Sequence, residues 1–194
     1  MFSIKNFREE IQKNGILQDN RYLVTFNPPE YLKREKTDQL TLRCETAQIP
    51  GVAFATIEGP PRIGYGPVES NPYGVIFDDV TFTFLLDSEA KIHELFYKWM
   101  SSIVNYESQG QASLKEARGP VSGMKPFELG YKDKYSTDID ISVYNSNNKK
   151  VMEVKLYRAF PKALPTFDTA WQSANSPIKL PVRFAYTDYT AKYY

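Results

Sequence analysis

Short segments in which apolar and polar residues alternate predict that this chain is built mainly from β-strands. The clearest segment is 75–86, where Val80, Phe82 and Phe84 face one way and the residues between them face the other. Most of these segments end at proline, glycine or a polar cluster, which is typical of strand ends. The predicted strands are 21–27, 40–45, 75–86, 139–144, 152–157 and 178–186.

Helical spacing replaces the alternation in two places. After the capping candidates Asp87 and Ser88, apolar residues recur as they do on a helix that packs against a sheet. These apolar residues are Ile92, Leu95, Phe96, Trp99 and Ile103. Residues 1–15 show a looser helical spacing among charges, which predicts a short amphipathic arm. The residues expected in core packing are Phe82, Phe84, Phe96 and Trp99.

Three segments show no period and are predicted to lie on the surface. The segment 59–74 holds four Pro and four Gly and is expected to be a long stiff loop or an irregular hairpin. Long loops in compact domains usually carry function, most often by reaching a partner. The candidate contact residues of this loop are Arg62, Tyr65, Glu69 and Tyr73. The segment 105–138 is a second long loop, and the charged segment 30–38 is a solvated connection.

Composition agrees with a mainly β chain. The 14 Tyr, 12 Phe and 2 Trp, with 13 Pro against 10 Gly, favour strands and stiff loops over helices. A chain of 194 residues buries enough surface to form a core without disulfides or metals. The expected fold is a two-sheet β-sandwich or barrel with one packed α-helix and long loops.

The residues that catalysis or metal binding requires are sparse. Cys44 is the single cysteine and His93 the single histidine, so no intramolecular disulfide and no multi-cysteine zinc site can form. Phosphate-loop, serine-hydrolase and zinc-protease motifs do not occur in the sequence. Asp78 and Asp79 are adjacent, and adjacent strand residues point to opposite faces. We therefore expect no enzymatic activity, no cofactor and no metal.

Charge and hydropathy narrow the class of partner. A balance of 24 Lys+Arg against 23 Asp+Glu gives no bulk electrostatic reason to bind nucleic acid. Residues 1–20 lack the apolar region of a signal peptide, and no segment has the roughly 20 apolar residues of a membrane span. We expect a chain made in the cytoplasm, with no membrane insertion. Two classes of protein remain compatible with the sequence. One is a structural subunit, and the other is a monomeric β-barrel module whose aromatic residues bind nucleic acid or glycan.

Three stretches resemble the tail tube proteins of contractile-tailed, T4-like bacteriophages. They are Asn20–Val24, which opens the first strand, Leu42–Gly51, which ends in Ile-Pro-Gly, and Phe77–Phe84, which leads through Asp87 into the helix. The resemblance extends over about residues 20–189 and includes Phe96 and Trp99 in the helix. It implies a tail tube-like β domain at 20–194, preceded by an N-terminal arm at 1–19.

The resemblance implies a structural subunit of a virion tail. Such subunits form hexameric rings that stack into a hollow tube, through which phage DNA passes during genome ejection. Neighbouring sheets join edge to edge, and the loop 59–74, with Arg62, Tyr65, Glu69 and Tyr73, reaches the next ring. The implied partners are further copies of the chain and the phage sheath and baseplate proteins, with assembly in the host cytoplasm. The long segments 30–38 and 105–138 are also compatible with a second hypothesis, in which the chain is a tube-like baseplate protein that initiates or terminates the tube.

Overall fold

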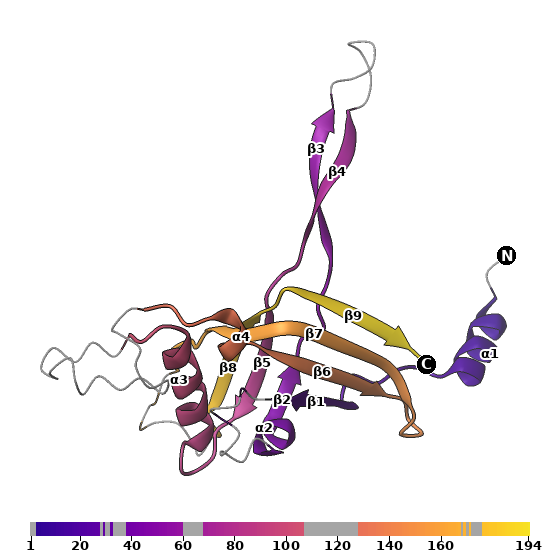
Figure 1. Ribbon diagram of the computed structural model, residues 1–194. Coiled ribbons are helices and arrows are strands. Elements are labelled where there is room, and N and C mark those ends of the chain that lie inside the picture. The colour runs from indigo at the N-terminus through magenta and orange to yellow at the C-terminus, as the bar shows by residue number, and fades with distance from the viewer. Residues whose placement is uncertain are drawn as a thin grey trace, which may run out of the picture.

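The computed structural model describes residues 3–27, 29, 32, 38–59, 68–106, 128–167, 169, 171 and 176–194 (Figure 1). Its helices are α1 (Ile4–Asn14), α2 (Asp38–Arg43), α3 (Lys91–Ile103) and α4 (Lys132–Tyr135). Its strands are β1 (Tyr22–Phe26), β2 (Cys44–Ala47), β3 (Ala53–Gly59), β4 (Glu69–Ile76), β5 (Val80–Leu85), β6 (Thr137–Tyr144), β7 (Lys150–Ala163), β8 (Lys179–Ala185) and β9 (Asp188–Tyr193).

One antiparallel sheet of seven strands folds over itself into two layers. Its order is β1-β6-β7-β8-β5-β2, and β9 pairs with the other edge of β7. The first part of β7 lies between β6 and β9, whereas its last residues pair with β8. The corner is a β-bulge at Arg158, whose φ of 52° is left-handed and where the register with β6 shifts. The mainly β sandwich expected from the sequence is therefore confirmed.

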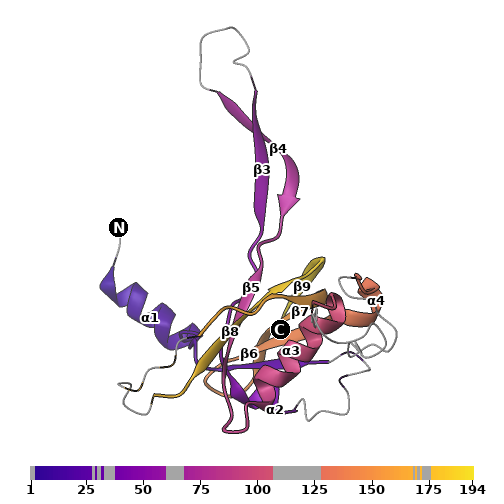
Figure 2. The ribbon, with the colours of Figure 1, turned by 90° about the vertical axis from the view of Figure 1, so that its left-hand side faces the viewer.

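Aromatic side chains fill the space between the layers. Phe82, Phe84, Phe96 and Trp99, which the sequence placed in the core, are fully buried. The ring of Phe84 on β5 lies 5.0 Å from that of Phe96, so α3 covers the core where the layers are open (Figure 2). The indole Nε1 of Trp99 donates a hydrogen bond to the carbonyl of Tyr135 at 2.7 Å. This bond satisfies the one polar atom of the largest core side chain.

Asp87 caps α3, as its place before the apolar stripe suggested. Its Oδ1 accepts a hydrogen bond from the backbone N–H of Ile92 at 3.2 Å. Partial burial pushes the pKa of Asp87 upward, but backbone hydrogen bonds from Ile92 and Lys91 outweigh it and lower the pKa below its usual range. The ionised carboxylate therefore stabilises the start of the helix.

The prediction of a strand at 40–45 is wrong in its first half. Residues 38–43 form the helix α2, and the strand is limited to Cys44–Ala47. Leu40 is buried and Leu42 is exposed, so these two leucines do not share a face as the alternation required. A short apolar pattern is compatible with a strand or a helix, and the helix is the structure in which Leu40 packs against the core.

Two further differences concern the C-terminal half. Phe160 and Pro161, expected to break the pattern, continue β7 to Ala163, with a bulge between Pro161 and Ala163 that accommodates the proline. The strand β9 follows β8 and was not predicted. Pro181 was expected at a strand edge or a bulge. It pairs with Thr83 of β5, and among the described residues this part of β8 has no strand on its other side.

The segment 59–74 takes the hairpin form of its two expected alternatives. β3 pairs with β4 over 53–59 and 69–76, so 69–74 is strand, and residues 60–67 lie outside the described part. Pro72 is tolerated because each strand of an isolated hairpin is an edge. The strand expected at 75–86 is split, because 77–79 carry the chain from the hairpin into the body.

The expected loop 105–138 is shorter than predicted at its C-terminal end. Residues 132–135 form α4 and β6 begins at Thr137, while 107–127 lie outside the described part. A bridge between Val104 and Leu129 and a hydrogen bond from Gly130 N–H to the carbonyl of Ile103 at 2.8 Å join its two ends.

Candidate assembly surfaces

The β3–β4 hairpin projects from the sandwich as a separate arm (Figures 1 and 2). Phe54 and Val75 are directly paired across the strands and are 62% and 56% exposed. Ile57 and Tyr73 are exposed as well. A two-stranded hairpin is only marginally stable by itself in water, and contiguous exposed apolar side chains usually mark an interaction surface. These features make the hairpin a candidate interaction surface.

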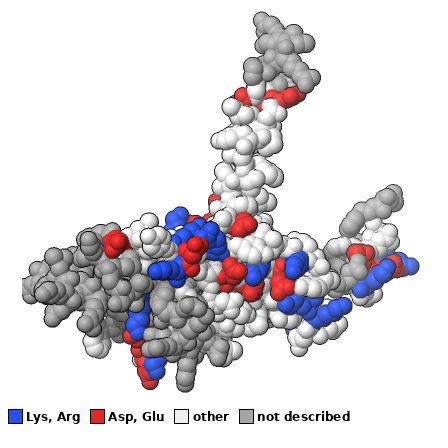
Figure 3. All heavy atoms as spheres, in the orientation of Figure 1, with Lys and Arg blue, Asp and Glu red and all other residues white. Residues whose placement is uncertain are grey.

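Within the two described strands of the hairpin, the charged residues are all acidic. β3 and β4 contain no Lys or Arg, and their acidic residues are Glu58 and Glu69. Figure 3 shows the hairpin shaft almost free of charge, whereas acidic and basic side chains intermingle over the body. A partner for the shaft would thus present apolar surface, with room for positive charge near Glu58 and Glu69.

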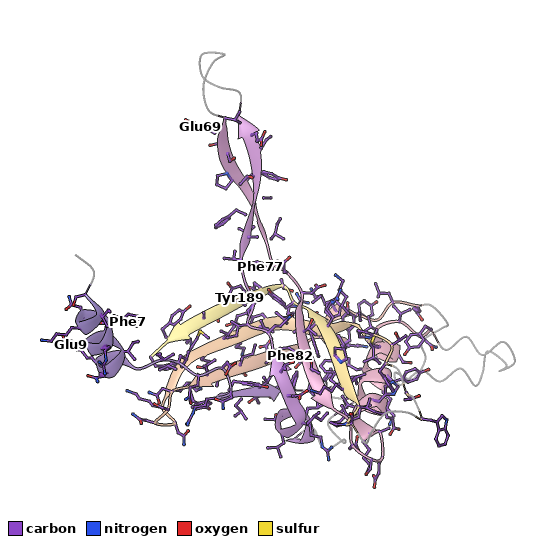
Figure 4. The ribbon with its side chains drawn as sticks, turned by 180° about the vertical axis from the view of Figure 1, so that it is seen from behind. Phe7, Glu9, Glu69, Phe77, Phe82 and Tyr189 are labelled. Carbon is purple, nitrogen blue, oxygen red and sulfur yellow. The ribbon has the colours of Figure 1, made fainter. Side chains whose placement is uncertain are left out.

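An aromatic cluster holds the foot of the hairpin to the body (Figure 4). The ring of Phe77 lies 5.7 Å from Tyr189 and 6.1 Å from Tyr186. Burial raises the pKa of Tyr186, and the nearby hydroxyl of Tyr189 and carboxylate of Asp78 raise it further. Lys162 adds an ion pair to Asp79 at 2.7 Å. Packing and charge together set the direction of the hairpin.

The layer β9-β7-β6-β1 ends in two edge strands, of which β9 is exposed and β1 is partly buried. Among the described residues, β1 pairs with β6 alone and β9 with β7 alone. Three antiparallel pairings separate β1 from β9, so these two edge strands run in opposite directions. Unpaired edges of this kind invite pairing with another chain.

The hydrogen-bond pattern shows which backbone groups face outward at these edges. Tyr194 donates its N–H to the carbonyl of Val151 at 3.0 Å, and such bonded positions alternate along an antiparallel ladder. Ala191 and Tyr193 therefore point their N–H and C=O groups away from β7. By the same reasoning from the bond between Tyr144 N–H and the carbonyl of Arg21, Val24 directs its backbone away from β6, but only 1% of Val24 is exposed, so this part of the β1 edge is covered within the single chain.

One face of this layer is polar. Its side chains line a hollow of about 270 Å³ and come from β6, β7 and β9. They are Asp140, Glu153, Lys155, Tyr157, Thr190 and Lys192. Lys155 pairs with Asp138 at 3.0 Å and Lys150 with Glu153 at 3.1 Å, so acidic and basic groups offset each other. Partial burial raises the pKa of Asp140 in spite of Lys155 nearby.

The opposite face of the layer contains an apolar hollow at the end where β1 begins. Its volume is about 330 Å³. The apolar lining comes from the segment after α1, from β1, from the end of β2 and from β6 and β7. Its principal residues are Leu17, Tyr22, Ile49, Val143 and Met152.

The described residues offer little that could catalyse a reaction. They contain no group of three or more His, Cys, Asp or Glu residues able to hold a metal ion. His93 lies against the rings of Tyr97 and Phe167. Burial raises the pKa of the Cys44 thiol to about 12, which removes the thiolate that a nucleophile needs. None of the described helices is long and apolar enough to cross a membrane.

The residues predicted to contact a partner are only partly described. Glu69 and Tyr73 lie on β4 and are exposed, whereas Arg62 and Tyr65 fall outside the described residues. Sequence reasoning missed Phe54 on β3. It also missed the β9 edge, although Tyr189, Ala191 and Tyr193 alternate with polar residues and carry the signal of a strand.

Solved structures of contractile injection systems share this fold. A chain of the anti-feeding prophage baseplate matches with a TM-score of 0.60 at 10% identity, over 91% of this chain and 95% of that chain. A chain of the anti-feeding prophage tube-terminating cap matches with a TM-score of 0.58 at 15% identity, over 92% of each chain. A chain of an extracellular contractile injection system, the PVC sheath–tube complex in the extended state, matches with a TM-score of 0.56 at 14% identity over 100% of both chains. No curated protein sequence matches the chain.

The sequence pattern of the phage tail tube proteins matches residues 17–192. This span contains both layers of the sandwich, the projecting hairpin, β1 and all of β9 but its last residue. The chain belongs to the phage tail tube protein family.

Proposed function

We propose that this protein is the structural subunit of a virion tail tube, in which hexameric rings stack into a conduit for DNA inside a contractile sheath. The observation that carries the proposal is the four-stranded layer with one polar face and two edge strands of opposite direction. Family membership supports it. The partners are further copies of the chain, the sheath and the baseplate.

Ring formation uses the edges of this layer. β1 of one copy pairs with β9 of the next once the part of the chain that covers Val24 moves aside. Because the two strands run in opposite directions, the new pairing is antiparallel like the others. Six such layers make a closed sheet of about 24 strands, which is larger than the porin barrels that enclose water-filled channels. Closure of the ring pairs every strand edge of the sheet. Head-to-tail contacts between identical copies form a ring only when the last copy meets the first.

The polar face of the layer lines the lumen. The opposite face holds core residues such as Ile139, Ile141 and Leu156, so the polar face is the one left for water and DNA. A strongly basic wall would hold DNA phosphates through counterion release. The paired charges of Lys155 with Asp138 and Lys150 with Glu153 give a wall that lets DNA slide.

Stacking uses the hairpin. Its apolar shaft, with Phe54 and Val75, packs against the neighbouring ring, and Glu69 and Tyr73 on β4 extend this surface. Arg62 and Tyr65 are further predicted contact residues of the same segment. Contacts between rings do not close on themselves, so they generate a tube. Covering the shaft also removes the exposed apolar surface that a monomer carries.

Substitution of Ala191 by proline tests the edge pairing. Proline removes the Ala191 N–H that points away from β7, so the fold of one copy loses no ladder bond while the joint to the next copy loses one. The matched control Ala191→Val keeps the N–H. We expect rings or tubes by negative-stain electron microscopy for the control and the native chain, and monomers for Ala191→Pro with unchanged circular dichroism. Rings of Ala191→Pro as abundant as those of the control would refute the β9 joint.

A second candidate is a tube-like protein of the baseplate or the tube end. Chains of a baseplate and of a terminating cap match this fold as well as a chain of a sheath–tube complex does. Such a protein forms a single ring and stops. Tubes that lengthen with concentration favour the tube subunit, whereas isolated rings at all concentrations favour the baseplate or cap protein, and a persistent monomer favours a binding module.

A further inference from the structure

The N-terminal helix carries an apolar ridge outside the sandwich. Ile4, Phe7 and Ile11 recur along one side of α1, and Ile4 and Phe7 are more than half exposed. Figure 4 shows Phe7 and Glu9 on α1, well apart from the strands of the body. Lys5 and Glu9 form an ion pair on another side of the helix. The apolar ridge of α1 is therefore suited to packing against an apolar surface.

A matching surface lies at one end of the four-stranded layer. A single row of paired residues crosses all four strands there, namely Tyr22, Val143, Met152 and Tyr193. The apolar hollow of about 330 Å³ lies on the core side of this row and is lined by three of the four. Tyr193 faces the same side but is 78% exposed. The core side of the layer is therefore uncovered between the hollow and the β9 edge.

The position of α1 in the chain indicates which copy of the protein it contacts. α1 ends at Asn14, and eight residues later the chain enters the row at Tyr22, on the edge that joins the next copy. Residues 17–19 of the same chain line the rim of their own hollow. Figure 1 shows α1 beyond the end of the layer where β1 starts and β9 ends. A helix leaving this point lies beside the β9 edge of the adjoining copy.

The dimensions fit this placement. Eleven helical residues span about 16 Å at 1.5 Å per residue. Three strand spacings of about 4.8 Å take the helix from the joint across β9 and β7 to β6 of the adjoining copy. That path passes over Tyr193 and Met152 and ends at the hollow.

We propose that α1 of each copy packs its Ile4–Phe7–Ile11 ridge over the β9 edge and into the apolar hollow of the next copy in the ring. This inference rests on the edge-joined ring proposed above. It makes α1 a strap that crosses each joint on the core side, while the strand pairing closes the joint itself. The strap covers Tyr193 and fills a hollow that a single chain leaves open.

A disulfide between two different copies tests the strap. In a Cys44→Ser background, Phe7→Cys protein is mixed with Tyr193→Cys protein under mild oxidation, so only a contact between copies can link them. The control pair replaces Tyr193→Cys with Leu129→Cys, an exposed residue near the end of α3. We expect about tenfold more linked dimer from the first pair on a non-reducing gel, because docking raises the effective thiol concentration. The Phe7→Cys/Tyr193→Cys double variant, at concentrations too low for assembly, reports any link within one chain.

The outcomes separate this inference from the proposed function. Linked dimer above the control supports the strap. A link that forms only within the double variant shows that α1 folds onto its own chain and overturns the strap. Rings in the microscope with no linked dimer also overturn it and leave the tube subunit standing. Monomers with no linked dimer overturn both.

Discussion

Replacement of Phe54 by serine separates the stability of one copy from the strength of ring stacking. Phe54 lies on the projecting hairpin, is 62% exposed, and pairs with the equally exposed Val75 rather than with the core. The substitution therefore changes the free energy of unfolding of a single copy by no more than about 0.5 kcal/mol, as is usual for surface positions. In the proposed tube the same side chain would be buried against the neighbouring ring.

The size of the stacking effect follows from the exposed area. A phenylalanine presents about 200 Å², of which the exposed 62% is about 120 Å². At about 25 cal/mol per Å², burial of that area is worth about 3 kcal/mol at each contact. Because 1.4 kcal/mol is a factor of ten, each contact weakens about 100-fold, and since a hexameric ring makes six of these contacts the concentration at which rings stack should rise by at least that factor.

Sedimentation velocity over a concentration series measures that threshold, and thermal unfolding of the unassembled protein measures the stability of one copy. Leu42→Ser is the matched control, because Leu42 is an exposed apolar residue on α2. It should leave both quantities unchanged. A stacking threshold for Phe54→Ser equal to that of the control would show that the hairpin shaft is not the stacking surface. A large loss of unfolding free energy would show that the hairpin belongs to the fold of one copy.

Three more predictions concern the body of the protein. Trp99→Ala should lower the unfolding free energy by about 3–5 kcal/mol in urea titrations, because it opens a cavity and orphans the Tyr135 carbonyl. Trp171→Ala, at a fully exposed tryptophan, should have no effect, and equal losses at the two sites would contradict the packing of α3. The Cys44 thiol has a pKa of about 12 in the native chain against 9.0 in the unfolded chain, so near pH 8 the native protein holds about a thousandfold less thiolate than the denatured protein. Its reaction with a disulfide reagent should therefore be much slower in native protein, and comparable rates would mean that the thiol is not buried. The lowered pKa of Asp87 means that the unfolded chain holds its proton more tightly, so the stabilisation by Asp87 is present above about pH 4 and disappears as the pH falls through the lower folded value. Thermal unfolding of Asp87→Asn should show a weaker loss of stability in acid than the native chain, and an unchanged acid profile would rule out the cap.

Local periodicity was sufficient where one element buries one continuous face. The stripe that includes Phe96 and Trp99 predicted α3, because a helix on a core must repeat its apolar residues at its own period. The same holds for Phe82 and Phe84 on β5. It failed at Leu40 and Leu42, because a few alternating residues do not distinguish a strand from one turn of helix.

The candidate surfaces were less accessible to sequence reasoning. Glu69 and Tyr73 were predicted as contact residues because the segment around them is rich in proline and glycine. That composition indicated an unusual segment, but it did not show that residues 69–74 form a strand. Phe54 carried no such mark. An exposed apolar residue on a projecting hairpin looks in the sequence like any strand residue, because exposure depends on where the rest of the chain lies.

The sequence by itself determined the fold class, the residues of the core and the absence of the motifs that common enzymes carry, since each of these depends on residue type and on spacing within one element. The tertiary structure decided which strands pair, that β7 turns through Arg158 into the second layer, and that β1 and β9 remain as edges. Strand pairing joins residues that are far apart in the chain, and alternation reveals two faces without showing which one is covered. The surfaces that would build a tube are left over after that pairing, so only the folded chain reveals them.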